Sequence, residues 1–238
     1  MEQIQPKTPK KTPEVMTHLK RDVIQLPKVI RQASGINING KRIKSFIFTT
    51  DVAVIVNNNA DAVLAVYPFT PSPAVIQSLM VASSLPIVSG VGGGTTQGAR
   101  SANMALMAES ADSMAVIANS PTSAETISKI NELVDIPIII TVVSKHTDIQ
   151  PLLDAGVDII NVSGGKDTAE IVRLNREKYP DLPIIATGGR SEESILETIE
   201  AGANAITYTP PTTGELFRKR MEDYRKSEAE RAAEREEE

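Results

Sequence analysis

Asp154-Ala-Gly-Val-Asp158 is nearly repeated further along the chain as Glu200-Ala-Gly-Ala-Asn204. In both copies a glycine follows an amphipathic segment, which suits the residue just past the C-terminus of a helix. A short apolar run, 159–163 or 205–209, begins directly afterwards. A helix that ends on glycine and leads at once into an apolar strand is typical of a parallel α/β fold.

The same theme extends over the chain from Ser45 onward. Eight short apolar runs alternate with longer segments: 46–50, 62–67, 86–89, 114–118, 138–143, 159–163, 184–187 and 205–209. Helical candidates between them include 123–134, 169–178 and 192–201. Strands that alternate with helices form right-handed βαβ units, and eight such units favour closure into a barrel. We therefore predict an α/β fold, a single-domain (β/α)8 TIM barrel over residues 45–224, with an open doubly wound sheet as the alternative.

The segments outside the barrel have their own patterns. Residues 1–14 are polar, basic and rich in proline, which predicts a flexible arm. Residues 15–33 carry apolar side chains at helical spacing, which predicts an N-terminal helix despite Pro27. The pair Asn39-Gly40, flanked by alternating isoleucines, is typical of a type I′ hairpin, and we expect residues 35–44 to plug the N-terminal end of the barrel.

A charged helix is expected at the end of the chain. Residues 225–238 are nearly all charged or alanine, which predicts a solvated helical tail. Four apolar side chains precede the tail, and we expect them to dock the start of this helix on the barrel: Leu216, Phe217, Met221 and Tyr224.

Composition excludes several kinds of site. The chain has no cysteine, which removes disulfides, thiolate metal ligands and a cysteine nucleophile. Two histidines are too few for a multi-histidine metal centre, so we expect no metal site. A net charge of −5 does not indicate a nucleic-acid partner, and no apolar run of 18 residues indicates a membrane span. We expect a cytoplasmic protein and leave a homo-oligomer open.

The segments that follow the strands are rich in glycine, serine and threonine. In such barrels the carboxyl ends of the strands carry the active site, and glycine lets backbone N–H groups approach an anion. The residues that we expect to bind a phosphate or similar ligand are Gly92, Gly93, Gly94, Thr95, Ser163, Gly164, Gly165, Lys166, Gly188, Gly189, Arg190, Tyr208 and Thr209. Tight structural turns are the alternative interpretation.

Three residues are candidates for catalysis. Asp51 follows the first strand and is either a general base or the N-cap of a helix over 52–59. Lys145 follows the fifth strand, where it could form a Schiff base or stabilise an enolate, or be solvated. His146 beside it could transfer protons, or lie outside a cap formed by Thr147 and Asp148. If the protein is an enzyme, we expect Asp51 and Lys145 to face one cavity.

Two family resemblances add to these patterns. Thr187-Gly-Gly-Arg-Ser191 and Ala201-Gly-Ala-Asn-Ala205 resemble the phosphate-binding half of the ribulose-phosphate-binding and aldolase-type barrels, over about residues 158–215. That resemblance implies a phosphate-binding role for the backbone at 188–190, with Tyr208 and Thr209 nearby, and implies no catalytic residue.

The whole chain also resembles a family of short TIM barrels found largely in Gram-positive bacteria. The resemblance rests on stretches such as Asn39-Gly-Lys-Arg-Ile-Lys44, Ala65-Val-Tyr-Pro-Phe69 and Asn161-Val-Ser-Gly-Gly-Lys166. Members often carry only the generic label "hydrolase", which implies no mechanism.

These observations favour a metabolic enzyme that acts on a small phosphorylated or otherwise anionic molecule by proton transfer or carbon–carbon bond chemistry. Three alternatives stay open: a hydrolase, a ligand-sensing barrel without turnover, and a flavin-dependent oxidoreductase that uses FMN. The sequence itself requires no cofactor.

Overall fold

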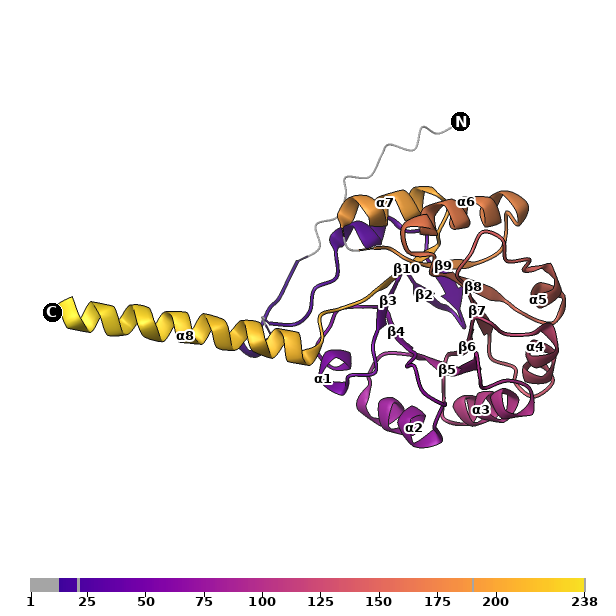
Figure 1. The fold of residues 1–238 in the computed structure, drawn as a ribbon, viewed down its shortest axis with the longest axis horizontal. Coiled ribbons are helices and arrows are strands. Elements are labelled where there is room, and N and C mark those ends of the chain that lie inside the picture. The colour runs from indigo at the N-terminus through magenta and orange to yellow at the C-terminus, as the bar shows by residue number, and fades with distance from the viewer. Residues whose placement is uncertain (1–12, 21, 190, 238) are drawn as a thin grey trace, which may run out of the picture.

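Eight parallel strands close into a barrel in the order β10-β3-β4-β5-β6-β7-β8-β9 (Figure 1). The computed structural model describes residues 13–20, 22–189 and 191–237. The barrel strands are β3 (Ser45–Phe48), β4 (Ala62–Ala65), β5 (Ile87–Gly93), β6 (Ala115–Asn119), β7 (Ile138–Val142), β8 (Ile159–Val162), β9 (Ile184–Thr187) and β10 (Ala205–Tyr208). The predicted TIM barrel is confirmed, and each of the eight apolar runs forms a strand.

Helices surround the barrel between the strands. They are α1 (Val52–Ile55), α2 (Pro73–Ala82), α3 (Ala99–Ser110), α4 (Ala124–Asn131), α5 (Gln150–Asp154), the 3-10 turn η3 (Gly165–Asp167), α6 (Thr168–Lys178) and α7 (Glu192–Glu200). The repeated Ala-Gly pairs end α5 and α7 as predicted. Gly156 and Gly202 follow these helices with φ of 112° and 111°, a backbone conformation that favours glycine.

A hairpin closes the N-terminal end of the barrel. Strands β1 (Ile36–Ile38) and β2 (Lys41–Ile43) pair antiparallel, and Asn39 and Gly40 between them have φ of 48° and 80°, as a type I′ turn requires. The three isoleucines of the hairpin are buried in one apolar cluster with the inward-facing residues of the barrel strands, including Phe46, Leu64, Ile117 and Ile139. Figure 1 shows β2 within the ring of strands. The predicted plug is therefore confirmed.

Two predictions about local structure are wrong. The described residues of this segment, 15–20 and 22–33, form no α-helix; they contain the 3-10 turns η1 (His18–Lys20) and η2 (Lys28–Gln32) and a single β-bridge from Ile24 to Asn58. Pro27 lacks a backbone N–H, and the spaced side chains share no buried face, because Val15 and Leu19 are exposed while Ile30 is buried. Strand β5 also continues four residues past its predicted end, through a bulge between Gly90 and Gly92. The expected arm falls mostly on residues 1–12, which lie outside the described part of the chain.

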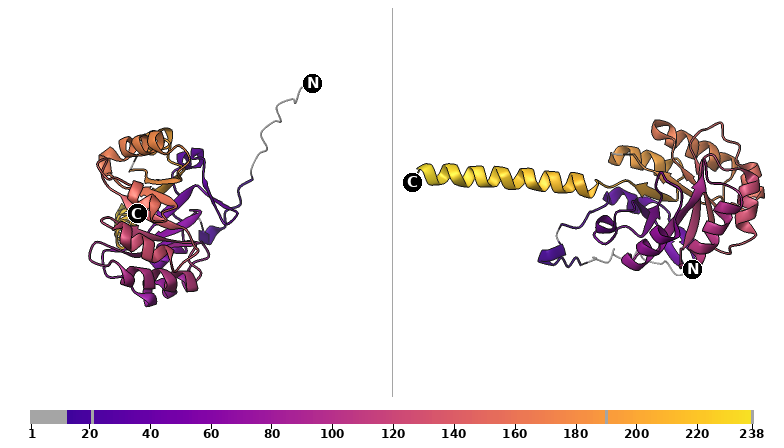
Figure 2. Two further views of the ribbon diagram at one scale, coloured as in Figure 1. Left: turned by 90° about the vertical axis from the view of Figure 1, so that its right-hand side faces the viewer. Right: turned by 60° about the horizontal axis from the view of Figure 1, so that its bottom comes forward.

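The last helix, α8 (Thr213–Glu237), projects away from the barrel (Figures 1 and 2). The expectation that its first apolar residues dock on the barrel is wrong, because Phe217 is 67% exposed and Tyr224 is 55% exposed. The charged tail simply continues this projecting helix. Within the described residues, no helix has the length and apolar character needed to cross a membrane.

We predict that truncation of the plug destabilises the whole barrel. Ile43 is completely buried between the hairpin and the strands, so Ile43→Ala should lower the free energy of unfolding by about 2–5 kcal/mol, because it leaves a cavity. Urea unfolding followed by circular dichroism measures this loss. The exposed Lys41→Ala in the same hairpin is the control and should change the stability by less than about 0.5 kcal/mol. Equal, small effects of both changes would contradict the plug.

Candidate functional site

The interior of the barrel changes from apolar to polar toward the carboxyl ends of its strands. Inward-facing positions alternate along a strand, so Ile139 is followed on the same face by Thr141, and Ile159 by Asn161. The upper positions surround a cavity of about 190 Å³, lined by Phe48, Val66, Ile117, Asn119, Thr141, Asn161, Ser163, Thr187, Thr207 and Thr209. We call it the inner cavity.

Hydrogen bonds connect most of these polar side chains. Asn161 Nδ2 donates to Thr141 Oγ1 at 3.4 Å, and Thr141 Oγ1 donates to Asn119 Oδ1 at 3.3 Å. On the adjacent strands, Thr187 Oγ1 donates to Ser163 Oγ at 3.3 Å. The network therefore holds the side chains of β6, β7 and β8 in fixed orientations at the floor of the mouth.

Two buried polar atoms of the inner cavity have no hydrogen-bond partner among the described residues: Asn161 Oδ1 and Thr207 Oγ1. Their residues are only 5% and 3% exposed. A buried polar atom without a partner costs about 1–3 kcal/mol. The two atoms therefore keep unused hydrogen-bonding capacity beside the inner cavity.

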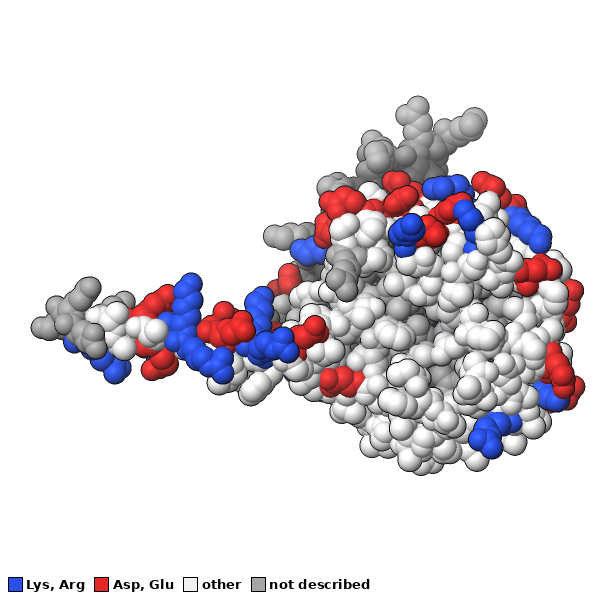
Figure 3. All heavy atoms as spheres, viewed as in Figure 1, with Lys and Arg blue, Asp and Glu red and all other residues white. Residues whose placement is uncertain are grey.

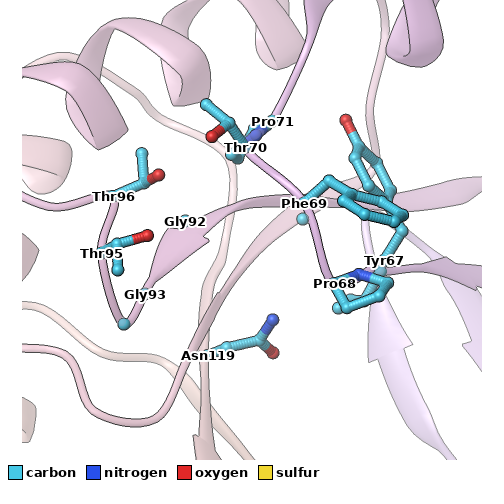
Figure 4. A pocket seen from close by; sticks show the side chains of 13 residues that line it. Tyr67, Pro68, Phe69, Thr70, Pro71, Gly92, Gly93, Thr95, Thr96 and Asn119 are labelled. Carbon is cyan, nitrogen blue, oxygen red and sulfur yellow. The ribbon is translucent and has the colours of Figure 1, made fainter.

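A larger cavity of about 460 Å³ adjoins the inner cavity and shares Val66 and Asn119 with it. We call it the outer cavity. One wall is the loop 67–71, whose ends are tied because Ser72 N donates to Tyr67 Oη at 2.8 Å. The opposite wall is the glycine-rich end of β5 with Thr95 and Thr96. Figure 4 shows Asn119 lying between the two walls.

Packing within the protein also explains why glycine is found in this wall. The backbone N–H of Gly93 donates to Thr96 O at 2.8 Å, and that of Gly94 donates to Pro121 O at 2.9 Å. Both N–H groups, which the sequence offered as anion ligands, are therefore used within the protein. A Cβ atom on Gly93 would lie 2.1 Å from Asn119 O, which explains the absence of a side chain there.

The lining of both cavities is uncharged. Among the described residues, neither cavity is lined by Asp, Glu, Lys or Arg. Figure 3 shows the same distribution, with a hollow over the barrel surrounded by white atoms and charged side chains gathered toward the periphery. Recognition in the mouth therefore rests on hydroxyl groups, amide groups and the backbone.

The predicted catalytic residues have other partners in the structure. Asp51 caps α1 and accepts hydrogen bonds from Ala53 N at 2.9 Å and Val54 N at 3.4 Å, and Thr213 Oγ1 donates to its other oxygen. The Thr213 hydroxyl and these N–H groups lower the pKa of Asp51.

Lys145 and His146 also lie apart from the cavity lining. Lys145 pairs with Glu170 at 2.9 Å, which raises the pKa of the lysine. His146 is exposed. None of the three candidates lines either cavity, so the structure does not bring Asp51 and Lys145 together there.

The predicted binding residues divide into three groups. Gly92, Gly93, Gly94 and Thr95 line the outer cavity, and Ser163 and Thr209 line the inner one. Gly164, Gly165, Lys166, Gly188, Gly189 and Tyr208 follow or end their strands without lining either cavity. Arg190 lies outside the described residues.

The first turn of α7 is already occupied by its own side chains. Ser191 and Ser194 form a capping box, and Ser194 Oγ also donates to Gly188 O at 2.9 Å. The N–H of Glu193 and the Ser191 hydroxyl lower the pKa of the Glu193 carboxyl. Phosphate binding at 188–191 stays a prediction, in a place where a carboxylate already uses part of the positive helix end.

Sequence reasoning missed the residues that build the inner cavity, Asn119, Thr141, Asn161, Thr187 and Thr207. The signal was available, because each lies two positions after a buried inward-facing residue of its strand. Across the part of the chain that the structure describes, no three His, Asp or Glu side chains are grouped to hold a metal ion.

Comparison with known proteins supports the fold and leaves the family open. No family model matches the chain. A segment of 70 residues, 27% of this chain, is 41% identical to inosine-5'-monophosphate dehydrogenase of Halalkalibacterium halodurans. The match covers 14% of the length of that enzyme.

Solved structures with the same architecture include several enzymes. A 2,3-dimethylmalate lyase of the PEP mutase/isocitrate lyase superfamily has a TM-score of 0.60 at 13% identity, covering 85% of both chains. Phosphonopyruvate hydrolase in complex with oxalate and Mg²⁺ has a TM-score of 0.59 at 11% identity, covering 82% of this chain and 83% of the other. The 4-hydroxy-tetrahydrodipicolinate synthase of Methylacidiphilum fumariolicum SolV has a TM-score of 0.55 at 16% identity, covering 71% of this chain and 68% of the other. At these identities the similarity shows a shared aldolase-type TIM barrel.

We predict that Gly93→Ala disrupts the wall of the outer cavity. The added methyl group would overlap Asn119 O, and φ of Gly93 is 109°, so packing and backbone strain should each cost about 1–3 kcal/mol. Gly94→Ala is the matched control, because its φ is 62° and its Cβ would meet no atom within 4 Å. Thermal unfolding of both variants measures the difference, and equal melting temperatures would show that the wall is not packed as described.

We predict that Thr213→Val raises the pKa of Asp51 toward its ordinary value, because the variant removes the hydroxyl that donates to the carboxylate. A lowered folded-state pKa means that Asp51 stabilises the fold above its unfolded-state pKa and loses this contribution as the pH falls through the folded-state value. The variant should therefore lose stability near neutral pH and little in acid. NMR titration of the Asp51 carboxyl carbon measures the shift, and an unchanged pKa would refute the contact.

Proposed function

We propose that this protein is a metabolic enzyme that binds a small hydroxylated carboxylate or phosphorylated molecule in the two cavities at the mouth of the barrel. The observation that carries the proposal is the pair of buried atoms without partners, Asn161 Oδ1 and Thr207 Oγ1. An amide oxygen can only accept a hydrogen bond, so the ligand must present a donor such as a hydroxyl group to Asn161. The hydroxyl groups of Thr207 and Thr209 can donate to its anionic oxygens.

The enzymes of similar fold support this ligand class. They include a lyase named for dimethylmalate and a hydrolase named for phosphonopyruvate that binds oxalate, and these molecules are small acids. Carbon–carbon bond chemistry or proton transfer next to a carboxylate is the reaction class that we propose. The amide N–H groups of Asn119 and Asn161 that remain free within this network would stabilise negative charge that develops on such a substrate.

We still propose Asp51 and Lys145 as acid–base groups, on the condition that each side chain first releases its present partner. Asp51 would have to release Thr213 to accept a proton from a substrate, and Lys145 would have to release Glu170. Both contacts lie at exposed positions, where exchange of partners costs about 1 kcal/mol or less. The inner cavity would bind the substrate, and catalysis by either residue would require its side chain to move to that cavity.

A binding barrel without turnover is the second candidate. The observation that favours it is the uncharged lining of both cavities, since general acid–base catalysis usually needs an ionisable group within hydrogen-bond reach of the reacting atom. The two candidates share the binding site and differ in the fate of the ligand. Recovery of the bound molecule unchanged after prolonged incubation would favour the second.

We predict opposite effects of Thr207→Val on stability and on binding. Valine removes a buried hydroxyl without a partner, so the free protein should gain about 1 kcal/mol of stability. Binding of small hydroxy acids such as malate, measured by isothermal titration calorimetry, should weaken by about tenfold or more, because a ligand contact is lost. Asn161→Asp should weaken it further, since the added carboxylate repels an anion.

Thr198→Val on α7 is the matched control. Thr198 is equally buried, at 3% exposed, but its hydroxyl donates to Ser194 O at 2.8 Å. This variant should lose about 1 kcal/mol of stability and bind the same acids normally. If Thr207→Val is destabilised like the control, or binds every tested acid as well as the unmodified protein does, the inner cavity is not the binding site.

A further inference from the structure

The projecting helix α8 has no buried face. Of its residues whose exposure is described, Met221 and Ser227 are half-buried and all the others are exposed. It is tied to the rest of the protein near its start, by Thr213 to Asp51 and by an ion pair between Arg220 and Asp22 at 3.1 Å. A helix of 25 residues extends about 38 Å at 1.5 Å per residue. Most helices are stabilised mainly by burying one face, so this one lacks its usual support.

An apolar patch lies on the first half of α8. Phe217, Met221 and Tyr224 are spaced by four and three residues, which places them on one side of the helix. Phe217 and Tyr224 are 67% and 55% exposed. Large aromatic side chains that share one face of a projecting helix are typical of a surface that a partner covers.

Charge is distributed unevenly along α8. Residues 218–226 contain five basic and two acidic residues, and residues 227–238 contain six acidic and two basic residues. This order is the reverse of the one that the helix dipole favours, so it does not stabilise α8 as an isolated helix. The same order is complementary to itself when two copies of the helix lie antiparallel, because each basic half then lies beside an acidic half.

We propose that two copies of this chain associate through α8, with the two helices antiparallel and overlapping along their length, so that residues 218–226 of each, with Phe217, Met221 and Tyr224, lie beside the second half of the other. A two-fold axis across the helix pair uses the same surface twice and satisfies both charged halves at once. The antiparallel arrangement also places each helix end beside the opposite end of the partner dipole. The association is independent of the mouth, because no residue of α8 lines the inner or the outer cavity.

Charge exchange tests the proposal on the full chain. Arg218→Glu/Arg225→Glu makes the first half acidic, and Glu228→Arg/Glu230→Arg/Glu234→Arg makes the second half basic. Each variant alone then pairs like charges across the antiparallel helices, whereas an equimolar mixture pairs opposite charges. We expect sedimentation velocity to show a dimer for the unmodified protein and an association about tenfold or more weaker for each variant alone. The mixture should recover the dimer.

Two controls make the result specific. Lys41→Glu/Arg173→Glu changes the net charge by the same amount as the acidic variant, away from α8, and should leave the dimer intact. Circular dichroism should show that each variant keeps its helix content. The proposal would be overturned if the unmodified protein were a monomer at about 100 µM, the weakest dissociation constant that we expect for such an interface. A variant that dimerises normally alone, or a mixture that stays monomeric, would also overturn it.

Discussion

The alternation of inward-facing residues along the barrel strands is the constraint on which the structure depends. Every second side chain points into the barrel, and the lower positions are apolar and fully buried, with Phe46, Ile117 and Ile139 among them. The hairpin isoleucines close this apolar stack from the N-terminal end. Since the lower barrel is filled and closed, only the carboxyl end can admit a molecule, and there the same alternation presents amide and hydroxyl groups.

Polar groups at the top of an apolar stack have an energetic consequence. Burial removes them from water, and each atom that finds no protein partner costs free energy. Most of the inner cavity is satisfied by the chain of Asn161, Thr141 and Asn119, which fixes the orientation of these side chains. The remaining cost at Asn161 Oδ1 and Thr207 Oγ1 is the kind that natural proteins accept at functional sites. Under the proposed function, stability and binding are opposed at the same two residues.

The fold could be predicted from the sequence further than the site could. Strands β3 to β10 and the glycines after α5 and α7 follow local patterns, and Asn39-Gly40 specifies its own turn. The segment 15–33 and the start of α8 also carry apolar spacing, but spacing does not say whether a surface exists to cover it. The glycines of 92–94 suggested an anion site, whereas the N–H groups of Gly93 and Gly94 bond within the protein, and Gly92 and Gly93 leave no room for a Cβ atom. Asn161 and Thr207 were missed because a single polar residue in an apolar strand is no motif by itself. Its inward direction becomes clear only from its spacing of two positions after a buried, inward-facing residue of the same strand.

The most direct test of this binding site is a crystal structure of the protein with a bound small hydroxy acid, such as malate. We predict that the ligand lies in the inner cavity, with its hydroxyl group within about 3.2 Å of Asn161 Oδ1 and a carboxylate oxygen within about 3.2 Å of Thr207 Oγ1. We also predict that Asn119 and Thr141 keep the orientations described for the free protein. A ligand that instead occupies the first turn of α7, while both atoms of the inner cavity bond only to protein groups, would contradict this prediction.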